Sequence, residues 1–292
     1  MLAFLEKLGS LDRRLIFVAI ALTVAIPLAM KRPAPVDPSP IVQRLYDHID
    51  ALPAGSRMLL SLDYGPSTRP ENEPMAHALA RHCLENDLKL YIMSLWATGP
   101  PMATMLMDDV IVPDFPDKTY GVDYVNLGYK VGNQGLIQAL GSDFKGQYNS
   151  DTGHGERVPS RPIDDIPMMA NVGVIADMAM ILGIGSGSPG LKEWVQFAGD
   201  TEGVTIGGGV TAVEAPLLYP YYPKQLIGLM GGLQGAAEYE AALMTGKPRF
   251  ADTATTAMIR MFPQTVAHVV IVLFVVLGNI SYFATKRRER RF

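Results

Sequence analysis

The C-terminal end of the sequence carries a long apolar segment that suits lipid better than the core of a water-soluble protein. Residues 265–285 (TVAHVVIVLFVVLGNISYFAT) contain no Asp, Glu, Lys or Arg, and five Lys and Arg residues follow in 286–291. About 20 apolar residues allow a helix to cross the hydrocarbon layer of a bilayer, and a basic flank holds such a helix on the cytoplasmic side. A buried core helix is the alternative interpretation. We predict a transmembrane helix over 265–285.

A second apolar segment, residues 15–30 (LIFVAIALTVAIPLAM), lies near the N-terminus. It has no charged residue, but it is short and contains Pro27. Basic pairs at 13–14 and 31–32 can extend their side chains to the two membrane interfaces, which favours an uncleaved transmembrane anchor. A cleaved signal peptide is the alternative, although the following PLAMKRPAP lacks the small-x-small pattern of a cleavage site.

The positions of the basic residues predict the orientation in the membrane. Because Lys and Arg resist translocation, both ends are expected in the cytoplasm, and the part between the two spans on the periplasmic or extracellular side of the cell (inner) membrane. The predicted organisation is a cytoplasmic N-terminus (1–14), transmembrane helix 1 (15–30), a Pro-rich stalk (31–40), an extracytoplasmic α/β domain (41–251), a linker (252–264), transmembrane helix 2 (265–285) and a basic cytoplasmic tail (286–292).

The charge balance limits the expected partners. Eight of the 25 Lys and Arg residues, but only three of the 29 Asp and Glu residues, lie outside 31–264, so the central part is acidic. Such a surface repels nucleic acid, and no nucleic-acid partner is expected. The expected partners are the lipid bilayer, through two helices, and other membrane proteins or a second copy of the chain. Ala21, Ala25 and Ala29 recur at a four-residue spacing that permits close helix association.

Short apolar runs alternate with longer amphipathic stretches between the two anchors. This alternation is typical of an α/β fold with a doubly wound, mostly parallel sheet. We predict about six strands, at 58–63, 90–95, 124–127, 178–184, 204–206 and 226–230. The predicted helices cover 41–52, 74–85, 101–110, 133–140, 191–198, 212–221 and 233–243. Residues 141–166 show neither period, which indicates either a flap or partner-contacting loop or a mobile surface insertion.

The most informative local feature is a series of strands that end in glycine and lead directly into a helix. Glycine lets the backbone turn tightly and lets a ligand approach, and such loops gather at the carboxyl ends of parallel strands. We therefore predict a crevice for a partner or small polar ligand at this edge of the sheet. Its candidate residues are Asp63, Gly185, Ser186, Gly187, Ser188, Gly208, Gly209, Thr211, Gly231 and Gly232.

Two more specific interpretations of this edge have weaker support. Gly185, Gly187 and Gly190 formally match the G-x-G-x-x-G pattern of dinucleotide-binding loops, but the next predicted strand lacks the acidic residue that binds a ribose. A serine hydrolase is another interpretation, with Ser186 or Ser188 as nucleophile and His154 and Asp63 as partners. Neither serine has the flanking glycines of a nucleophile elbow.

The sequence predicts no metal site and no cofactor. His77 and His82 are five residues apart on a predicted helix, so their side chains face different directions. Asp63, Glu71 and Glu73 place carboxylates near the end of the first strand, where a bound cation is one interpretation. Acidic residues at a helix N-terminus account for the same pattern. Cys83 is the single cysteine, so there is no disulfide within the chain.

Four strings resemble a group of uncharacterised, membrane-anchored α/β proteins of prokaryotes. They are DYVNLGYK (123–130), PGLKEWVQ (189–196), GVTAVEAPLLYPYY (209–222) and GLMGGLQGAAEYE (228–240). The resemblance covers most of the central domain and implies no activity. The leading hypothesis is thus non-enzymatic: a membrane-tethered extracytoplasmic α/β domain acting as a binding or assembly subunit of a membrane protein complex. A membrane-anchored serine hydrolase-like enzyme is the alternative.

Overall fold

The computed structural model describes residues 12–253 and 255–289. These residues belong to two compact units. One unit, Val36–Ala257, contains a sheet and its surrounding helices, and the other combines the described parts of Met1–Pro35 and Met258–Phe292.

A six-stranded parallel sheet forms the centre of the Val36–Ala257 unit. Its strands are β1 (Arg57–Asp63), β2 (Lys89–Ser94), β3 (Tyr124–Tyr129), β4 (Met180–Gly185), β5 (Thr205–Val210) and β6 (Leu229–Gly231). Their order across the sheet is β3-β2-β1-β4-β5-β6, and every neighbouring pair is parallel. The prediction of an α/β fold with six parallel strands is confirmed.

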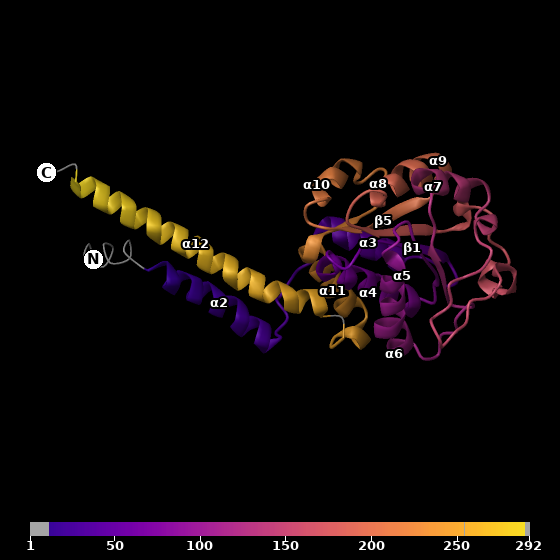
Figure 1. Cartoon of the computed structure of the whole chain (residues 1–292), viewed down its shortest axis with the longest axis horizontal. Coiled ribbons are helices and arrows are strands. Elements are labelled where there is room, and N and C mark those ends of the chain that lie inside the picture. The colour runs from indigo at the N-terminus through magenta and orange to yellow at the C-terminus, as the bar shows by residue number, and fades with distance from the viewer. Residues whose placement is uncertain (1–11, 254, 290–292) are drawn as a thin grey trace. The chain divides into compact units, whose positions relative to one another are not determined.

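Helices cover both faces of this sheet (Figure 1). One face carries α3 (Pro40–Asp50), α4 (Arg69–Glu85), α5 (Gly99–Leu106) and α11 (Gly232–Gly246), and the other carries α7 (Asn133–Ser142) and α8 (Leu191–Trp194). A π-helical turn, η1 (Met107–Ile111), and the short α6 (Val112–Asp114) continue α5. A second π-helical turn, η6 (Val195–Gly199), and α9 (Asp200–Glu202) continue α8. The remaining short elements are α10 (Ala215–Leu218), η2 (Lys145–Gln147), η3 (Ile163–Asp165), η4 (Pro167–Met169), η5 (Ile175–Asp177), η7 (Tyr219–Tyr221) and η8 (Pro248–Phe250).

The central strands are predictable because both of their faces are buried. A parallel strand covered on both sides needs apolar residues at every position, so it reads as a continuous apolar run. The strands β1 (RMLLSLD) and β4 (MILGIG) follow this pattern. Their residues Met58, Leu60, Ile181 and Leu182 have no exposed surface. These two strands pair directly at the middle of the sheet.

The start of α4 differs from the prediction. The predicted helix begins at residue 74, whereas α4 begins at Arg69 and contains Pro74. Proline is tolerated in the first turn of a helix, where backbone N–H groups have no partner within the helix, so Pro70 fits its position. Pro74 also lacks a backbone N–H group, and it lies near the same end of α4. The predicted start was therefore wrong by five residues.

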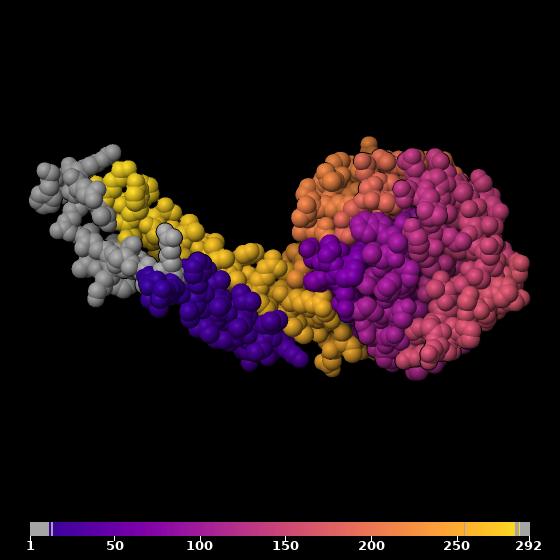
Figure 2. Space-filling model, in the orientation of Figure 1, coloured from indigo at the N-terminus to yellow at the C-terminus, as the bar shows by residue number. Residues whose placement is uncertain are grey.

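Residues 141–166, which lack a sequence period, are tied to the edge strand β3 by hydrogen bonds. The Thr152 N–H donates to the Asn126 carbonyl (2.8 Å), and the Asn126 side-chain amide donates to the Gly153 carbonyl (3.2 Å). The buried Asp151 carboxylate accepts from the Tyr120 hydroxyl (2.8 Å) and the Arg161 N–H (2.6 Å). The segment follows the outer surface of the unit (Figure 2). Isolated backbone bonds and side-chain bonds hold it in place of a continuous strand or helix, which explains the missing period.

The helices near the two ends of the chain differ in length. In α12 (Thr256–Glu289) the stretch Thr256–Phe283 is, among the described residues, the one helix long and apolar enough to cross a membrane. The helix α2 (Arg13–Met30) has 18 residues, so at 1.5 Å per residue it is about 27 Å long, slightly less than a hydrocarbon layer of about 30 Å. The prediction of two membrane-spanning helices is therefore supported for the C-terminal segment alone.

The Gly208→Ala substitution is expected to destabilise the Val36–Ala257 unit. Gly208 lies in β5 at φ +152°, and an added Cβ would meet the Gly183 carbonyl of β4. We expect the free energy of unfolding to fall by about 2 to 4 kcal/mol. Chemical denaturation followed by tryptophan fluorescence measures this change, because the two tryptophans of the chain, Trp96 and Trp194, both lie in this unit.

The matched control is Gly135→Ala. Gly135 lies in α7, and an added Cβ would meet nothing within 4 Å. Because alanine favours a helix over glycine, this variant should be stabilised by up to about 1 kcal/mol. Equal unfolding free energies for the two alanine variants would show that the close approach at Gly208 does not limit the fold.

Candidate functional site

The sheet contains one point at which its connections change direction. The chain after β1 passes through α4 on one face, and the chain after β4 passes through α8 on the other (Figure 1). The carboxyl ends of two such neighbouring strands are not covered by a helix, and open parallel α/β sheets bind ligands in the resulting crevice. Asp63 and Gly185 are the last residues of β1 and β4 and are paired in register. The crevice therefore lies above this pair.

Two cavities lie beside the loop that follows β4. The larger has a volume of about 530 Å³, and the smaller one of about 360 Å³. Both are lined by Ser188 and Pro189, so this loop separates them. The larger is completed by the start of α7 and by Glu193. The smaller is completed by the loop after β2 (95–98). Both are open to solvent, and the smaller one is a shallow surface depression.

The Asp63 carboxylate lies buried at the end of β1 and connects the surrounding segments by hydrogen bonds. It is fully buried and accepts hydrogen bonds from the Leu95 N–H (2.7 Å), the Ser61 hydroxyl (2.7 Å) and the Trp194 indole N–H (3.2 Å). Burial raises the pKa of this carboxyl group from 3.8 to about 7, although the three donors act in the opposite direction. Asp63 lines neither cavity. Its contacts join β1 to the end of β2 and to α8.

The loop after β4 is held by hydrogen bonds at both ends. At its start, the Ser186 N–H donates to the Asp63 carbonyl (3.2 Å). At its end, Glu193 accepts from the Ser188 hydroxyl (2.7 Å) and from the Gly190 N–H (2.8 Å). These contacts fix the loop before any ligand arrives, which reduces the entropy lost on binding.

Trp96 braces the same loop from the side of β2. Its indole N–H donates to the Pro189 carbonyl (2.6 Å). An added Cβ at Gly187 would lie 3.3 Å from the Trp96 ring, so the ring covers this glycine closely. The indole thus forms a wall of the smaller cavity and also supports the loop that separates the two cavities.

Two buried oxygen atoms at this edge of the sheet have no hydrogen-bond partner among the described residues. Asn72 of α4 donates its amide to the Gly185 carbonyl (2.7 Å), which leaves its side-chain oxygen unpaired. Glu214, which follows β5, has one unpaired buried carboxylate oxygen. Burial, together with the nearby charge of Glu193, raises the pKa of Glu214. Both atoms are acceptors, so the edge offers sites for hydrogen-bond donors.

The remaining predicted site residues lie away from the two cavities. Gly209 is inside β5, where an added Cβ would meet Met75 and Met230, and Gly208 lies against β4. An added Cβ at Gly232 would lie 2.7 Å from the Ala212 Cβ, and one at Gly231 3.0 Å from the Ala215 Cβ. The carbonyl of the buried Thr211 accepts from the Glu214 N–H (3.0 Å). These five residues allow close packing of backbone and line neither cavity.

The proposed serine hydrolase triad is not joined by hydrogen bonds. His154 is hydrogen-bonded to Asp108 (3.0 Å), and Ser188 donates to Glu193. Asp63 is surrounded by its three donors. Within residues 12–253, no hydrogen bond connects His154 to Asp63, Ser186 or Ser188. The G-x-G-x-x-G interpretation is weakened because the Gly190 N–H, at the start of the helical stretch that follows the loop, is already bonded to Glu193.

Several cavity residues were missed at the sequence level. They are Trp96 in the loop after β2, Glu193 in α8, and the polar residues at the start of α7, namely Asn133, Gln134 and Gln138. The signal was present in part, since the turn-forming residues 97–101 (ATGPP) directly follow a predicted strand. Recognising it required the strand order, which places the ends of β2 and β4 on either side of β1.

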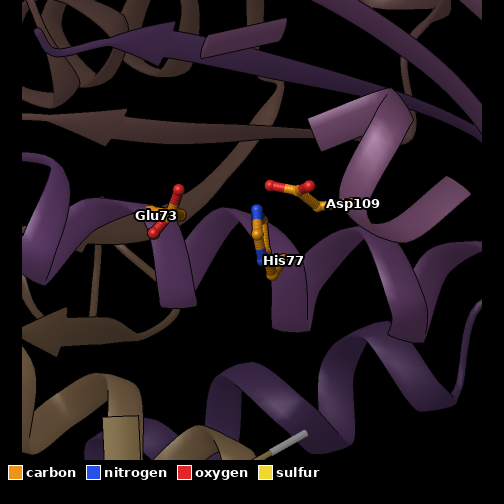
Figure 3. Close-up of side chains that lie close together, drawn as sticks. All are labelled: Glu73, His77 and Asp109. Atoms are coloured by element: carbon orange, nitrogen blue, oxygen red, sulfur yellow. The ribbon is translucent and has the colours of Figure 1, made fainter. Parts of the chain in front are cut away.

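A second polar cluster lies between α4 and η1. Glu73, His77 and Asp109 each present a side-chain nitrogen or oxygen atom, and these atoms lie within 4.8 Å of one another (Figure 3). From the sequence, Glu73 was considered as a cation ligand with Asp63 and Glu71, and His77 was compared only with His82. Glu73 is four residues before His77 and therefore on the same helix face. This cluster is a candidate for metal binding.

The Asp63→Asn substitution is expected to change how stability depends on pH. An unfolded Asp titrates near 3.8 and the folded Asp63 near 7. From about pH 4 to about pH 7, the folded protein keeps a proton that the unfolded chain loses, so this group lowers the free energy of unfolding as the pH rises. The asparagine variant lacks this contribution. Relative to wild type, it should become more stable by a few kcal/mol over that range.

Denaturation series at several pH values, followed by tryptophan fluorescence, measure this difference. If the difference in the free energy of unfolding between wild type and Asp63→Asn stays constant with pH, the pKa of Asp63 is not raised in the fold. The other carboxylates contribute equally to both proteins, so the comparison removes their effect on the pH dependence. Asp50 is one of them: its pKa is lowered to about 2, chiefly by its hydrogen bond with Lys247.

Comparison with protein-family models finds no match, and comparisons with curated proteins and with solved structures find no similar protein. The chemistry of the crevice and of the Glu73, His77 and Asp109 cluster is therefore the basis for assigning a function.

Proposed function

We propose that the Val36–Ala257 unit is a membrane-tethered binding domain that holds a small polar ligand in the crevice between β1 and β4. The observation that carries this proposal is the pair of cavities that meet at Ser188 and Pro189. Their lining residues come from the segments that follow β2, β3 and β4, and the change of direction in the sheet, where proteins of this architecture bind ligands, lies between β1 and β4. Hydrogen bonds from Glu193 and Trp96 hold the loop between them.

The residues around the larger cavity favour a neutral or cationic ligand. Its polar side chains are those of Asn133, Gln134, Gln138, Ser188 and Glu193, and neither cavity is lined by Lys or Arg. A phosphate-rich ligand would find no positive side chain there and would face the Glu193 carboxylate. Hydroxyl and amino groups, by contrast, can pair with side-chain amides and with a carboxylate. A small polyol, sugar or amine fits this chemistry best.

The tether in this proposal consists of both terminal helices. The apolar side chains of α12 are exposed to the surroundings, including Val272 and Phe283, and so are those of α2, including Phe17 and Leu28. Exposed apolar side chains along a helix suit a lipid environment. A two-pass topology with both basic ends in the cytoplasm would display the binding unit on the periplasmic or extracellular side. There it would act as a binding or assembly subunit of a membrane protein complex.

Filling the larger cavity should abolish ligand binding without unfolding the unit. An added Cβ at Gly135 meets nothing within 4 Å, and this residue lines the larger cavity, so Gly135→Phe places a ring in the open space. The full chain in detergent is titrated with glucose, glycerol, ethanolamine and, as an anionic comparison, inorganic phosphate. Trp96 beside the cavities reports binding through its fluorescence.

We expect one of the neutral or cationic probes to change the fluorescence saturably, and Gly135→Phe to weaken this binding at least about tenfold. The Gly135→Ala variant is the matched control and should bind like wild type. Saturable binding of phosphate, together with no response to the other probes, would refute the proposed ligand chemistry. Binding that is unchanged in Gly135→Phe would place the ligand elsewhere.

Reporter fusions test the topology. A fluorescent protein that matures only in the cytoplasm, fused after Phe292, should fluoresce in cells, because the predicted tail is cytoplasmic. The chain should also stay in the membrane pellet at alkaline pH in carbonate. Protease added to intact cells with a permeabilised outer envelope should cleave the central unit. A dark fusion, or extraction by carbonate, would be incompatible with the proposed arrangement.

A further inference from the structure

We propose that Glu73, His77 and Asp109 bind a divalent transition-metal ion of the zinc type. Glu73 and His77 lie four residues apart on α4, so their side chains project from the same helix face. Asp109 comes from η1, which packs against α4. One ligand atom from each residue lies within 4.8 Å of the others. In Figure 3 the His77 ring projects from α4 toward the Asp109 carboxylate, with Glu73 one turn before it on the same helix.

The three ligand atoms, all within 4.8 Å of one another, must move closer together to bind one ion. Zinc binds nitrogen and oxygen at about 2.0 to 2.2 Å, which places tetrahedral ligands about 3.4 Å apart. Small rotations of the side chains would bring the three atoms to this separation. Three protein ligands leave one position for water or another ligand, as in zinc sites that exchange ligands.

The kinds of ligand favour a transition metal over magnesium or calcium. An imidazole nitrogen suits Zn²⁺, Co²⁺ and related ions, whereas Mg²⁺ and Ca²⁺ prefer sites made of oxygen ligands. Two carboxylates and one neutral imidazole balance the charge of a divalent cation. The set is therefore selective by chemistry as well as by geometry.

The surroundings of Glu73 resemble the outer shell of a metal site. Glu73 is 6% exposed, and a buried carboxylate is costly unless a cation compensates its charge. Arg69, one helical turn earlier, pairs with one oxygen of this carboxylate. Such an outer partner fixes the orientation of a metal ligand.

Asp109 and its neighbour Asp108 face different parts of the structure. Asp108 and Asp109 are adjacent in η1, yet Asp108 is bonded to His154 (3.0 Å) and Arg157 (2.8 Å) of the 141–166 segment. Asp109 instead faces α4. Single π-turns within helices occur frequently at functional sites. Because Asp109 is exposed and His77 half-buried, an ion can reach the cluster from solvent.

This inference goes beyond the proposed crevice and does not depend on it. None of the three residues lines either cavity. A protein that binds no polyol or amine can still bind the metal, and the reverse also holds. Either proposal can therefore be refuted without affecting the other.

Cobalt titration of the full chain in detergent tests the site directly. The protein is purified with a tag that contains no histidine, treated with a chelator and freed of it. Co²⁺ bound by nitrogen and oxygen ligands at low coordination number gives visible absorption, which reports both stoichiometry and geometry. We expect one Co²⁺ per chain, displaced by one equivalent of Zn²⁺ and not displaced by an equal concentration of Mg²⁺.

Substitutions of the ligands provide the second readout. His77→Gln and Asp109→Asn should each weaken Co²⁺ binding at least about tenfold. His48→Gln is the matched control, because His48 is also a half-buried histidine on a helix of the same unit and should leave binding unchanged. Asp109 is exposed, so its variant is expected to fold even if a change at His77 disturbs α4. Circular dichroism checks the fold of each variant.

Three results would overturn the proposal. They are the absence of saturable binding near one equivalent, displacement of Co²⁺ by an equal concentration of Mg²⁺, and unchanged affinity in the folded Asp109→Asn variant. A His77→Cys variant adds a positive test, since a thiolate would restore binding and shift the cobalt absorption to a stronger sulfur-ligand band.

Discussion

The parallel pairing of β1 with β4 is the interaction on which the rest of the structure depends. It joins two segments more than a hundred residues apart, from Met58 opposite Met180 to Asp63 opposite Gly185. Helices on opposite faces follow these two strands, so the crevice exists only because they are neighbours. The pairing also brings the Asp63 carboxylate to the Leu95 N–H and the Trp194 indole, which connects three segments through one buried group.

The local hydrophobic pattern predicted most of the strands and helices, but not the order of the strands in the sheet. The apolar runs of β1, β2 and β4 mark strands because both faces of a central parallel strand are buried. The helices α7 and α11 were predicted nearly in full. The region 212–221 was predicted as one helix and instead contains the short α10 and η7; Pro216 lies in the first turn of α10, and Pro220, which has no backbone N–H group, prevents α10 from continuing as a regular α-helix. Strand order depends on contacts across the sheet, which a period of two or 3.6 residues does not encode.

The candidate site was predictable in part for the same reason. Glycine at a strand end indicates that another group lies close to the backbone. The sequence does not show whether this group is a ligand, a side chain or a neighbouring strand. At Gly187 it is the Trp96 ring beside a cavity, whereas at Gly208 it is the backbone of β4. Ser188, one of the predicted site residues, lies in the loop after β4 and lines both cavities. The polar start of α7 was not predicted as part of the site, because it is brought there only by the long crossover from β3 to β4.

The two outer strands of the sheet have a consequence for how this protein can associate with others. An exposed strand edge with unpaired backbone groups invites another chain to extend the sheet. Here β6 has only three residues, and along β3 the Thr152 N–H already occupies the Asn126 carbonyl. Among the described residues, neither border therefore offers a long free row of backbone donors and acceptors. Extension of this sheet by a strand of a second chain is therefore disfavoured at both borders.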